Sequence, residues 1–337
     1  MIRDAISMVI SAFDLTEAQA AQVMEEIMSG EATPAQFAAF VTALRLKGET
    51  PEEIAGMARV MRAKARRIDF GKRLLDTCGT GGDGAGTFNV STAAAFVAAG
   101  AGVHVAKHGN RAVSSHCGSA DVLEALGAKI DLEPEGALTC LRETGFCFMF
   151  APRFHPAMSH AAAPRREIGI RTVFNVLGPL TNPAGATRQV IGVADTTLAE
   201  KMAQVLALLD CEHALVVHGE EGLDELSVSG PSLVWEVRDG RVERNRVSPA
   251  DAGLSTHPAE SLRGGTPAEN ASMLRAVLNG EKGPLRDFTL FNSAAGLVAF
   301  GHAQTLAEGV RLGAESIDSG AAAKVVDRFV EVSNDIV

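Results

Sequence analysis

The sequence predicts an α/β protein with a small N-terminal helical domain and a larger α/β domain, in which helices flank a mostly parallel central sheet. Up to about residue 70, apolar residues recur at helical spacing. From residue 74 onward, short β-type runs alternate with helical stretches. This alternation is typical of parallel strands joined by crossover helices. We therefore expect residues 1–70 to form the helical domain and residues 71–337 to form the α/β domain.

Three segments of the N-terminal region carry the signals of helices. Apolar residues at helical spacing fill Thr16–Met28. A second helix opens at Thr33-Pro34, runs through Leu46 and ends before Gly48. The third runs from Thr50 through Ala65. Its first turn holds a proline and two glutamates, which suit the positive end of a helix dipole. Together the three segments predict a small bundle.

Five short apolar runs, separated by helical stretches, predict the parallel strands. They are Leu74–Thr77, Val103–Ala106, Cys147–Phe150, Val190–Val193 and Ala214–Val217. Two further runs, 233–236 and 241–247, are joined across an Asp-Gly dipeptide, which favours the tight turn of a β-hairpin. The tail from 305 to 332 has a helical pattern. The sheet should therefore consist of parallel strands extended by one hairpin.

The segment 76–92 is the most informative in the chain. Five glycines fall within eight positions, at Gly79, Gly81, Gly82, Gly84 and Gly86. An apolar run enters the segment, and three polar residues (Asn89, Ser91 and Thr92) open an Ala-rich helical stretch behind it. Glycine lets backbone N–H groups approach an anion closely, and a helix start adds unpaired donors. We therefore expect this loop to hold phosphate or diphosphate, with the polar residues capping the helix or binding a metal carried by the phosphate.

Other interpretations of a glycine-rich loop fit less well. Such a loop is often only a tight connection, and Gly79-x-Gly81-x-x-Gly84 alone is a weak match to the dinucleotide-binding fingerprint. That fingerprint requires an acidic residue at the end of the next strand, where this chain has Lys107-His108-Gly109-Asn110. No segment matches the phosphate loop of ATPases.

Composition bounds the class of protein. The net charge of −10 disfavours general nucleic-acid binding. No apolar run reaches the roughly 20 residues that span a bilayer. The five cysteines form no Cys-x-x-Cys pair, which favours free thiols in a reducing compartment. We therefore expect a cytoplasmic protein that contacts neither nucleic acid nor membrane.

Several blocks of sequence, in order and at fitting distances, carry a resemblance to a known family. Residues 76–92 are similar to the signature of the anthranilate phosphoribosyltransferases, enzymes of tryptophan biosynthesis. The further blocks that match are 107–115, 118–127, 154–158, 165–175, 177–183 and 222–225. Small departures occur at Ala112, His116 and Cys117, none of which should be catalytic. The resemblance implies transfer of the 5-phosphoribosyl group from 5-phosphoribosyl diphosphate to the amine of anthranilate, the second step from chorismate to tryptophan.

The resemblance also implies roles for individual residues. The residues expected to bind 5-phosphoribosyl diphosphate are Gly79, Gly82, Asp83, Thr87, Asn89, Ser91, Thr92, Lys107 and Ser119. Those expected to bind anthranilate are Gly79, His108, Asn110, His155, Met158 and Arg165, with Arg165 opposite the carboxylate. Lys107, His108 and Arg165 are the implied catalytic residues. Ser91, Asp224 and Glu225 would hold Mg²⁺, two ions per subunit. The family further implies a homodimer formed through the N-terminal helices, and a return of residues 165–185 to the helical domain.

The position of the acid pair Asp224-Glu225 in the chain supports its assignment as a metal site. An isolated Asp-Glu pair is more often surface charge. This pair follows the apolar strand 214–217 and a short loop, which puts it at the carboxyl edge of a parallel sheet, where ligands bind. Magnesium prefers hard oxygen ligands, usually one or two carboxylates together with substrate phosphates.

Some alternatives stay open from the sequence. His108 and His155 either act as a general base or only shape the acceptor pocket. Arg166 and Arg171 are interpreted as structural partners of nearby carboxylates. Two other functions also fit the architecture: a pyrimidine-nucleoside phosphorylase, which would not need the acid pair, and a noncatalytic relative that binds nucleic acid, which should carry a basic groove.

Overall fold

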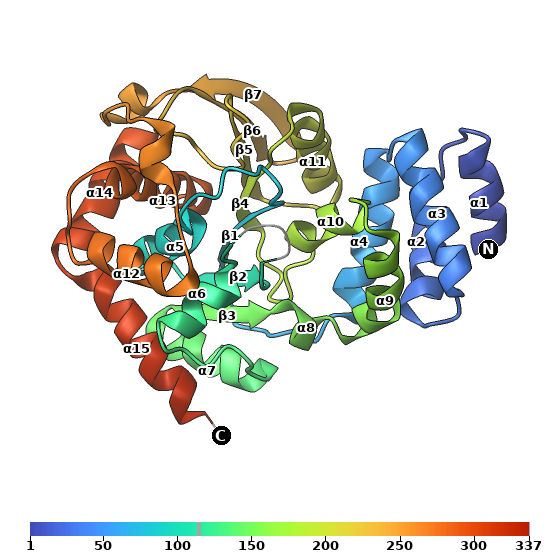
Figure 1. Cartoon of the computed structure of the whole chain (residues 1–337), viewed down its shortest axis with the longest axis horizontal. Helices are drawn as coiled ribbons and strands as arrows, with labels where there is room; N and C mark the ends of the chain where they lie inside the picture. Colours follow the sequence, from blue (N-terminus) through green and yellow to red (C-terminus); the bar gives the residue numbers. More distant parts are fainter. Residues whose placement is uncertain (113–115, 337) are drawn as a thin grey trace.

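The N-terminal helices begin where the sequence supplies caps. The computed structural model describes residues 1–112 and 116–336. The first four helices are α1 (Ile2–Ile10), α2 (Glu17–Met28), α3 (Pro34–Lys47) and α4 (Pro51–Lys64). Thr16, Thr33 and Thr50 each form a capping box at the start of α2, α3 and α4, which satisfies backbone donors that a helix start leaves free. These helices form the bundle on the right of Figure 1.

One seven-stranded sheet forms the centre of the larger part of the molecule. Its strands are β1 (Leu75–Gly79), β2 (Val105–Gly109), β3 (Phe146–Phe150), β4 (Arg188–Gly192), β5 (His213–Gly219), β6 (Ser232–Arg238) and β7 (Arg241–Val247). Their order is β3-β2-β1-β4-β5-β6-β7. Strands β1 to β5 run parallel, and the β6–β7 hairpin adds two antiparallel strands. The prediction of a mostly parallel sheet with an added hairpin is confirmed.

Helices cover both faces of the sheet, and successive strand residues alternate between the two cores. On β5, Leu215 and Val217 face the core shared with α5 (Val90–Gly100) and α13 (Pro284–Phe300). Ala214 and Val216 face the core shared with α11 (Thr196–Leu208) and the N-terminal bundle. The remaining helices are α6 (Ser119–Ala125), α7 (Pro134–Thr144), α8 (Ala151–Phe154), α9 (Ser159–Ile168), α10 (Phe174–Leu177), α12 (Pro267–Leu278), α14 (Leu306–Asp318) and α15 (Ala321–Asp335).

The chain returns to the N-terminal bundle after β3. Helix α9 packs on α2 and α3, and α10 packs on α4, as Figure 1 shows on the right of the sheet. Val173 and Leu177 are buried in the same core as the bundle. The bundle therefore contacts the carboxyl edge of the sheet through a segment that lies more than a hundred residues further along the chain.

Two helical details differ from the sequence-based expectation. Helix α1 was not expected, because its cap residue, Met1, makes no side-chain cap hydrogen bond and so gives no start signal. The helical tail is two helices, α14 and α15, because Gly320 takes a left-handed φ of 75° between them. Within the described ranges, no helix has the length and apolar character needed to cross a membrane.

Candidate active site

A polar cavity of about 570 Å³ lies at the carboxyl ends of the parallel strands. The glycine loop after β1, the start of α5, the end of β2 and the loop after β5 all line it. Every residue expected to bind the phosphoribosyl donor lines this cavity, and so do the three expected metal ligands: Gly79, Gly82, Asp83, Thr87, Asn89, Ser91, Thr92, Lys107, Ser119, Asp224 and Glu225. Parallel strands bring residues from these four segments together because their carboxyl ends share one edge. We name this space the donor cavity. Residues 113–115 of the matching block 107–115 lie outside the described residues.

The glycine loop is held against the acid pair. The Gly81 N–H donates to Asp224 Oδ2 at 2.8 Å, and the Thr80 N–H donates to the Gly192 carbonyl at 2.9 Å. A Cβ atom at Gly192 would lie 1.6 Å from the Asp224 carbonyl oxygen. Glycine at the end of β4 therefore lets the backbone of Asp224 lie directly on the sheet edge.

Asp224 and Glu225 are carboxylates placed where a cation would stabilise them. Burial, and secondarily the nearby Asp83, raises the pKa of Asp224 to about 7. Burial and the charge of Asp224 raise the pKa of Glu225 well above its usual range. Ser91 lines the same cavity. No group of three or more His, Cys, Asp or Glu side chains suited to a metal occurs in the described part of the chain, so an ion held here would need other oxygen ligands. The residues therefore fit Mg²⁺, which commonly completes its shell with phosphate and water oxygens.

Lys107 lies almost fully buried at the floor of the donor cavity. Its Nζ donates to the Thr77 carbonyl and, at 3.3 Å, to Ser91 Oγ. Burial lowers the pKa of Lys107, and the charge of Asp76 opposes that shift. Asp76 in turn accepts the His108 N–H at 3.2 Å. These contacts place one ammonium group beside the expected metal ligand Ser91.

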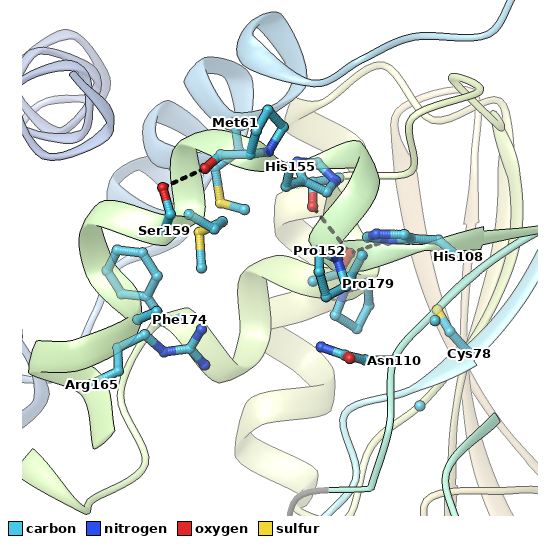
Figure 2. A pocket seen from close by; sticks show the side chains of 18 residues that line it. Met61, Cys78, His108, Asn110, Pro152, His155, Ser159, Arg165, Phe174 and Pro179 are labelled. Atoms are coloured by element: carbon cyan, nitrogen blue, oxygen red, sulfur yellow. Dashed lines mark hydrogen bonds between the residues drawn. The ribbon is translucent and has the colours of Figure 1, made fainter. Parts of the chain in front are cut away.

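A second cavity of about 530 Å³ adjoins the first. The residues expected to bind the acceptor all line it: Gly79, His108, Asn110, His155, Met158 and Arg165. Gly79, His108, Asn110 and Arg165 line both cavities. Figure 2 shows the Arg165 guanidinium and the Asn110 amide pointing into this space from opposite sides. We name it the acceptor cavity.

Two histidines stand side by side in the acceptor cavity. Their ring centroids lie 5.0 Å apart, and Figure 2 shows both rings at its edge. Burial lowers the pKa of His108 to about 3 and that of His155 to about 4, so both are neutral at neutral pH. His108 Nδ1 lies 3.2 Å from the Gly178 carbonyl, which assigns the proton to Nδ1. Nε2 of each ring is buried and has no hydrogen-bond partner among the described residues.

Arg165 lies near the end of α9, where it faces the acceptor cavity. Its guanidinium stacks on the ring of Phe174, with Cζ 5.4 Å from the centroid. Burial lowers the pKa of Arg165. A half-buried, stacked guanidinium is well suited to bind a carboxylate with two parallel hydrogen bonds.

Three features of the site had no signal in the sequence. Asn292 of α13 accepts the Leu226 N–H and donates to the Leu226 carbonyl, both at 2.9 Å, and so fixes the backbone beside the acid pair. Asn182 Nδ2 donates to Asp76 Oδ2 at 2.8 Å. Asn89 makes no cap hydrogen bond at the start of α5, contrary to one expectation. Its side chain instead donates to the Cys117 carbonyl at 3.0 Å and accepts from Asn270.

Arg171 also departs from its expected role as partner of a carboxylate. It forms no ion pair within residues 1–112 and 116–336. Its Nη2 instead donates to the Thr80 carbonyl at 3.3 Å.

Both parts of the chain match the models of one family of transferases. A family model described as the a/b domain of a glycosyl transferase family matches residues 71–323. The helical bundle domain of the same family matches residues 3–65. The chain is therefore a glycosyltransferase of this class.

Similar proteins narrow the class to one family. The anthranilate phosphoribosyltransferase of Chloroflexus aggregans is 61% identical, with 98% of each chain covered. That of Roseiflexus castenholzii is 59% identical, with 99% of this chain and 98% of the relative covered. Among solved structures, the enzyme from Thermus thermophilus has a TM-score of 0.93 at 48% identity, with 98% of this chain and 99% of that chain covered. The Saccharomyces cerevisiae enzyme in complex with PRPP and Mg has a TM-score of 0.92 at 30% identity, with 99% and 98% covered. The chain belongs to the anthranilate phosphoribosyltransferase family.

Proposed function

We propose that this chain transfers the 5-phosphoribosyl group of 5-phosphoribosyl diphosphate to the amine of anthranilate, in the tryptophan biosynthetic pathway. One observation carries the proposal: a polar cavity with a glycine loop and an acid pair adjoins a cavity with one stacked guanidinium. In the reaction, the bond between the anomeric carbon and diphosphate breaks, and diphosphate leaves with the electron pair. The amine nitrogen forms the new bond to carbon and then loses a proton.

The donor cavity supplies groups that bind phosphate oxygens. Backbone N–H groups of the glycine loop and the start of α5 provide donors and a partial positive charge. Thr92 Oγ1 is buried without a partner among the described residues, so it has a free hydroxyl for the donor. Lys107, whose Nζ donates to Ser91 Oγ, adds an N–H donor that is already in place before the reaction.

The acid pair and Ser91 are proposed to hold Mg²⁺, with two ions per subunit. A bound divalent cation would neutralise charge on the departing diphosphate. The protein's own contribution is to hold both carboxylates in place. Asp224 is bound to the Gly81 N–H, and Asn292 fixes the next turn of the loop. This arrangement keeps the acid pair within the donor cavity before the substrate binds.

The acceptor cavity orients anthranilate by its two functional groups. Arg165 binds the carboxylate, Asn110 lies across from it, and Met158 contributes apolar lining. The unpartnered Nε2 of neutral His108 accepts a hydrogen bond from the amine, which aims its lone pair at the anomeric carbon, and the ring of His155 lies beside it. Because a ring whose pKa is about 3 holds a proton weakly, His108 acts here as a hydrogen-bond acceptor that positions the amine.

Arg165 favours this acceptor over a pyrimidine. A guanidinium stacked on Phe174 complements a carboxylate, which pyrimidine nucleosides lack. The acid pair in the donor cavity also fits a metal-bound diphosphate better than free inorganic phosphate. The nucleoside phosphorylase reaction therefore ranks second and serves as the alternative in the test below.

The assembly and compartment are proposed on separate observations. Large apolar side chains are exposed around α1 and the end of α3: Ile10 at 69%, Phe13 at 65% and Leu46 at 83%. Exposed apolar residues gathered on a small helical domain favour a homodimer through these N-terminal helices. Light scattering should show a dimer that Phe13→Asp weakens. All five cysteines are free, as suits a cytoplasmic enzyme.

Product analysis tests the proposed reaction. The purified chain is incubated with anthranilate, 5-phosphoribosyl diphosphate and Mg²⁺, and the mixture is resolved by chromatography and mass spectrometry. The proposal predicts N-(5-phosphoribosyl)anthranilate and diphosphate in equal amounts. A parallel incubation contains a pyrimidine nucleoside and inorganic phosphate. Cleavage of the nucleoside there, with no transfer to anthranilate, would replace the proposal with the phosphorylase function.

A further inference from the structure

Arg171 occupies an unassigned position at the wall of the donor cavity. It lies between α9, which carries Arg165, and α10, which begins at Phe174. The segment therefore links the acceptor side of the site to the donor side. Arg171 lines the donor cavity and also a neighbouring cavity of about 340 Å³, so its side chain stands between the two spaces.

The Arg171 guanidinium lies directly over the glycine loop. A Cβ atom built at Gly82 would come 1.6 Å from Nη1, and Nη2 donates to the Thr80 carbonyl at 3.3 Å. The absence of a side chain at Gly82 is what admits the guanidinium to this position. A guanidinium has five N–H donors in a planar fork. One of them is used on Thr80, which leaves donors that can meet an oxygen anion above the loop.

The other cations of the donor cavity are committed elsewhere. Arg111 pairs with Asp121 and Glu124. Lys107 is buried at the floor beside Ser91. Arg165 is stacked on Phe174 toward the acceptor. In the described part of the chain, Arg171 is thus the arginine of this cavity that contacts the glycine loop without a carboxylate or aromatic partner.

We propose that Arg171 is a further substrate-binding and catalytic residue, whose guanidinium binds the diphosphate part of the donor. This inference rests on the proposed function. When the bond to the anomeric carbon breaks, its electron pair leaves with diphosphate, and negative charge grows on the bridging oxygen. A planar guanidinium fixed above the loop stabilises that charge with two parallel hydrogen bonds.

Binding of inorganic diphosphate tests this role without requiring turnover. Isothermal calorimetry with diphosphate and Mg²⁺ is carried out on wild type, Arg171→Gln, Arg171→Lys and the matched control Arg166→Gln. Arg166 is exposed on the neighbouring turn and lines neither cavity. Loss of a charge-assisted pair should raise the dissociation constant for diphosphate about 10-fold or more in Arg171→Gln. Arg171→Lys should raise the dissociation constant less, because lysine keeps the charge but lacks the planar fork. Arg166→Gln should bind diphosphate as wild type does.

Steady-state kinetics separates substrate contact from a merely structural role. Arg171→Gln should raise KM for 5-phosphoribosyl diphosphate, lower kcat because the charge on the leaving diphosphate is less stabilised, and leave KM for anthranilate within about two-fold of wild type. Unchanged diphosphate binding in Arg171→Gln would overturn the proposal. An equal rise in both KM values would also overturn it, because that result means the segment carrying Arg165 has moved. Inactive wild type that still binds diphosphate would count against the proposed reaction and not against the contact.

Discussion

Gly192→Ala tests whether the close approach of Asp224 to the sheet edge determines metal binding. The added Cβ would lie 1.6 Å from the Asp224 carbonyl oxygen and 2.5 Å from its carbonyl carbon. Both atoms belong to the backbone, so no side chain can rotate away. To restore an ordinary contact, the loop after β5 must move by roughly 1.8 Å. That displacement breaks the 2.8 Å hydrogen bond from the Gly81 N–H to Asp224.

Two measurable losses follow from this displacement. Overpacking should lower the free energy of unfolding by about 1–3 kcal/mol. Loss of the hydrogen bond to a carboxylate, worth about 1.5–3 kcal/mol, should raise the Mg²⁺ concentration for half-maximal activity by about 10-fold or more. The assay is a Mg²⁺ titration of the initial rate, accompanied by urea denaturation.

Gly230→Ala is the matched control for this substitution. Gly230 lies in the same loop region after β5, and a Cβ atom there would meet nothing closer than 4.0 Å. It should leave both the Mg²⁺ dependence and the stability near wild type. The reasoning is refuted if Gly192→Ala keeps the wild-type Mg²⁺ dependence, because the acid pair would then not depend on its contact with β4.

Three further predictions follow from the same geometry. Arg165→Gln should raise KM for anthranilate about 10-fold or more while KM for the donor stays near wild type, in steady-state kinetics; an equal change in both would contradict a carboxylate contact. Ring signals of His108 and His155 in NMR should not titrate between about pH 8 and about pH 5, because burial has moved both pKa values below that window; a midpoint near the ordinary value would show a solvated ring. Asn292→Leu leaves the Leu226 N–H and carbonyl without partners, which should cost about 1–3 kcal/mol per group in urea denaturation and weaken Mg²⁺ activation; unchanged activation would reduce Asn292 to a stabilising role.

Sequence patterns predicted the main helices and strands, because the signals for these elements lie in neighbouring residues. The alternation of apolar runs and helical stretches led to the parallel sheet, and the Asp239-Gly240 turn led to the hairpin of β6 and β7. Helix α1 was not predicted because no cap side chain precedes it. The division of the tail at Gly320 was not predicted because both flanking segments share a helical pattern.

Contacts between distant segments were harder to foresee. The acid pair was expected at the carboxyl edge of the sheet from its place after a strand, and it lines the donor cavity there. Asn292 contacts Leu226 across 66 residues of sequence. No pattern in the neighbouring residues predicts that this buried asparagine would bind the backbone of a distant loop. The position of Arg171 over Gly82 depends on how α9 and α10 return to the bundle, which periodicity does not encode. The roles assigned to individual site residues stay predictions until variants are measured.

The loss of anthranilate fluorescence tests the central claim most directly. Purified wild type is mixed with anthranilate, 5-phosphoribosyl diphosphate and Mg²⁺, beside the double variant Asp224→Asn, Glu225→Gln and a reaction without metal. The account predicts rapid loss of fluorescence in wild type that depends on Mg²⁺ and is strongly impaired in the double variant. Stable fluorescence in wild type, with the donor bound, would contradict transfer to anthranilate. Full activity in the double variant would contradict the assignment of the metal to the acid pair.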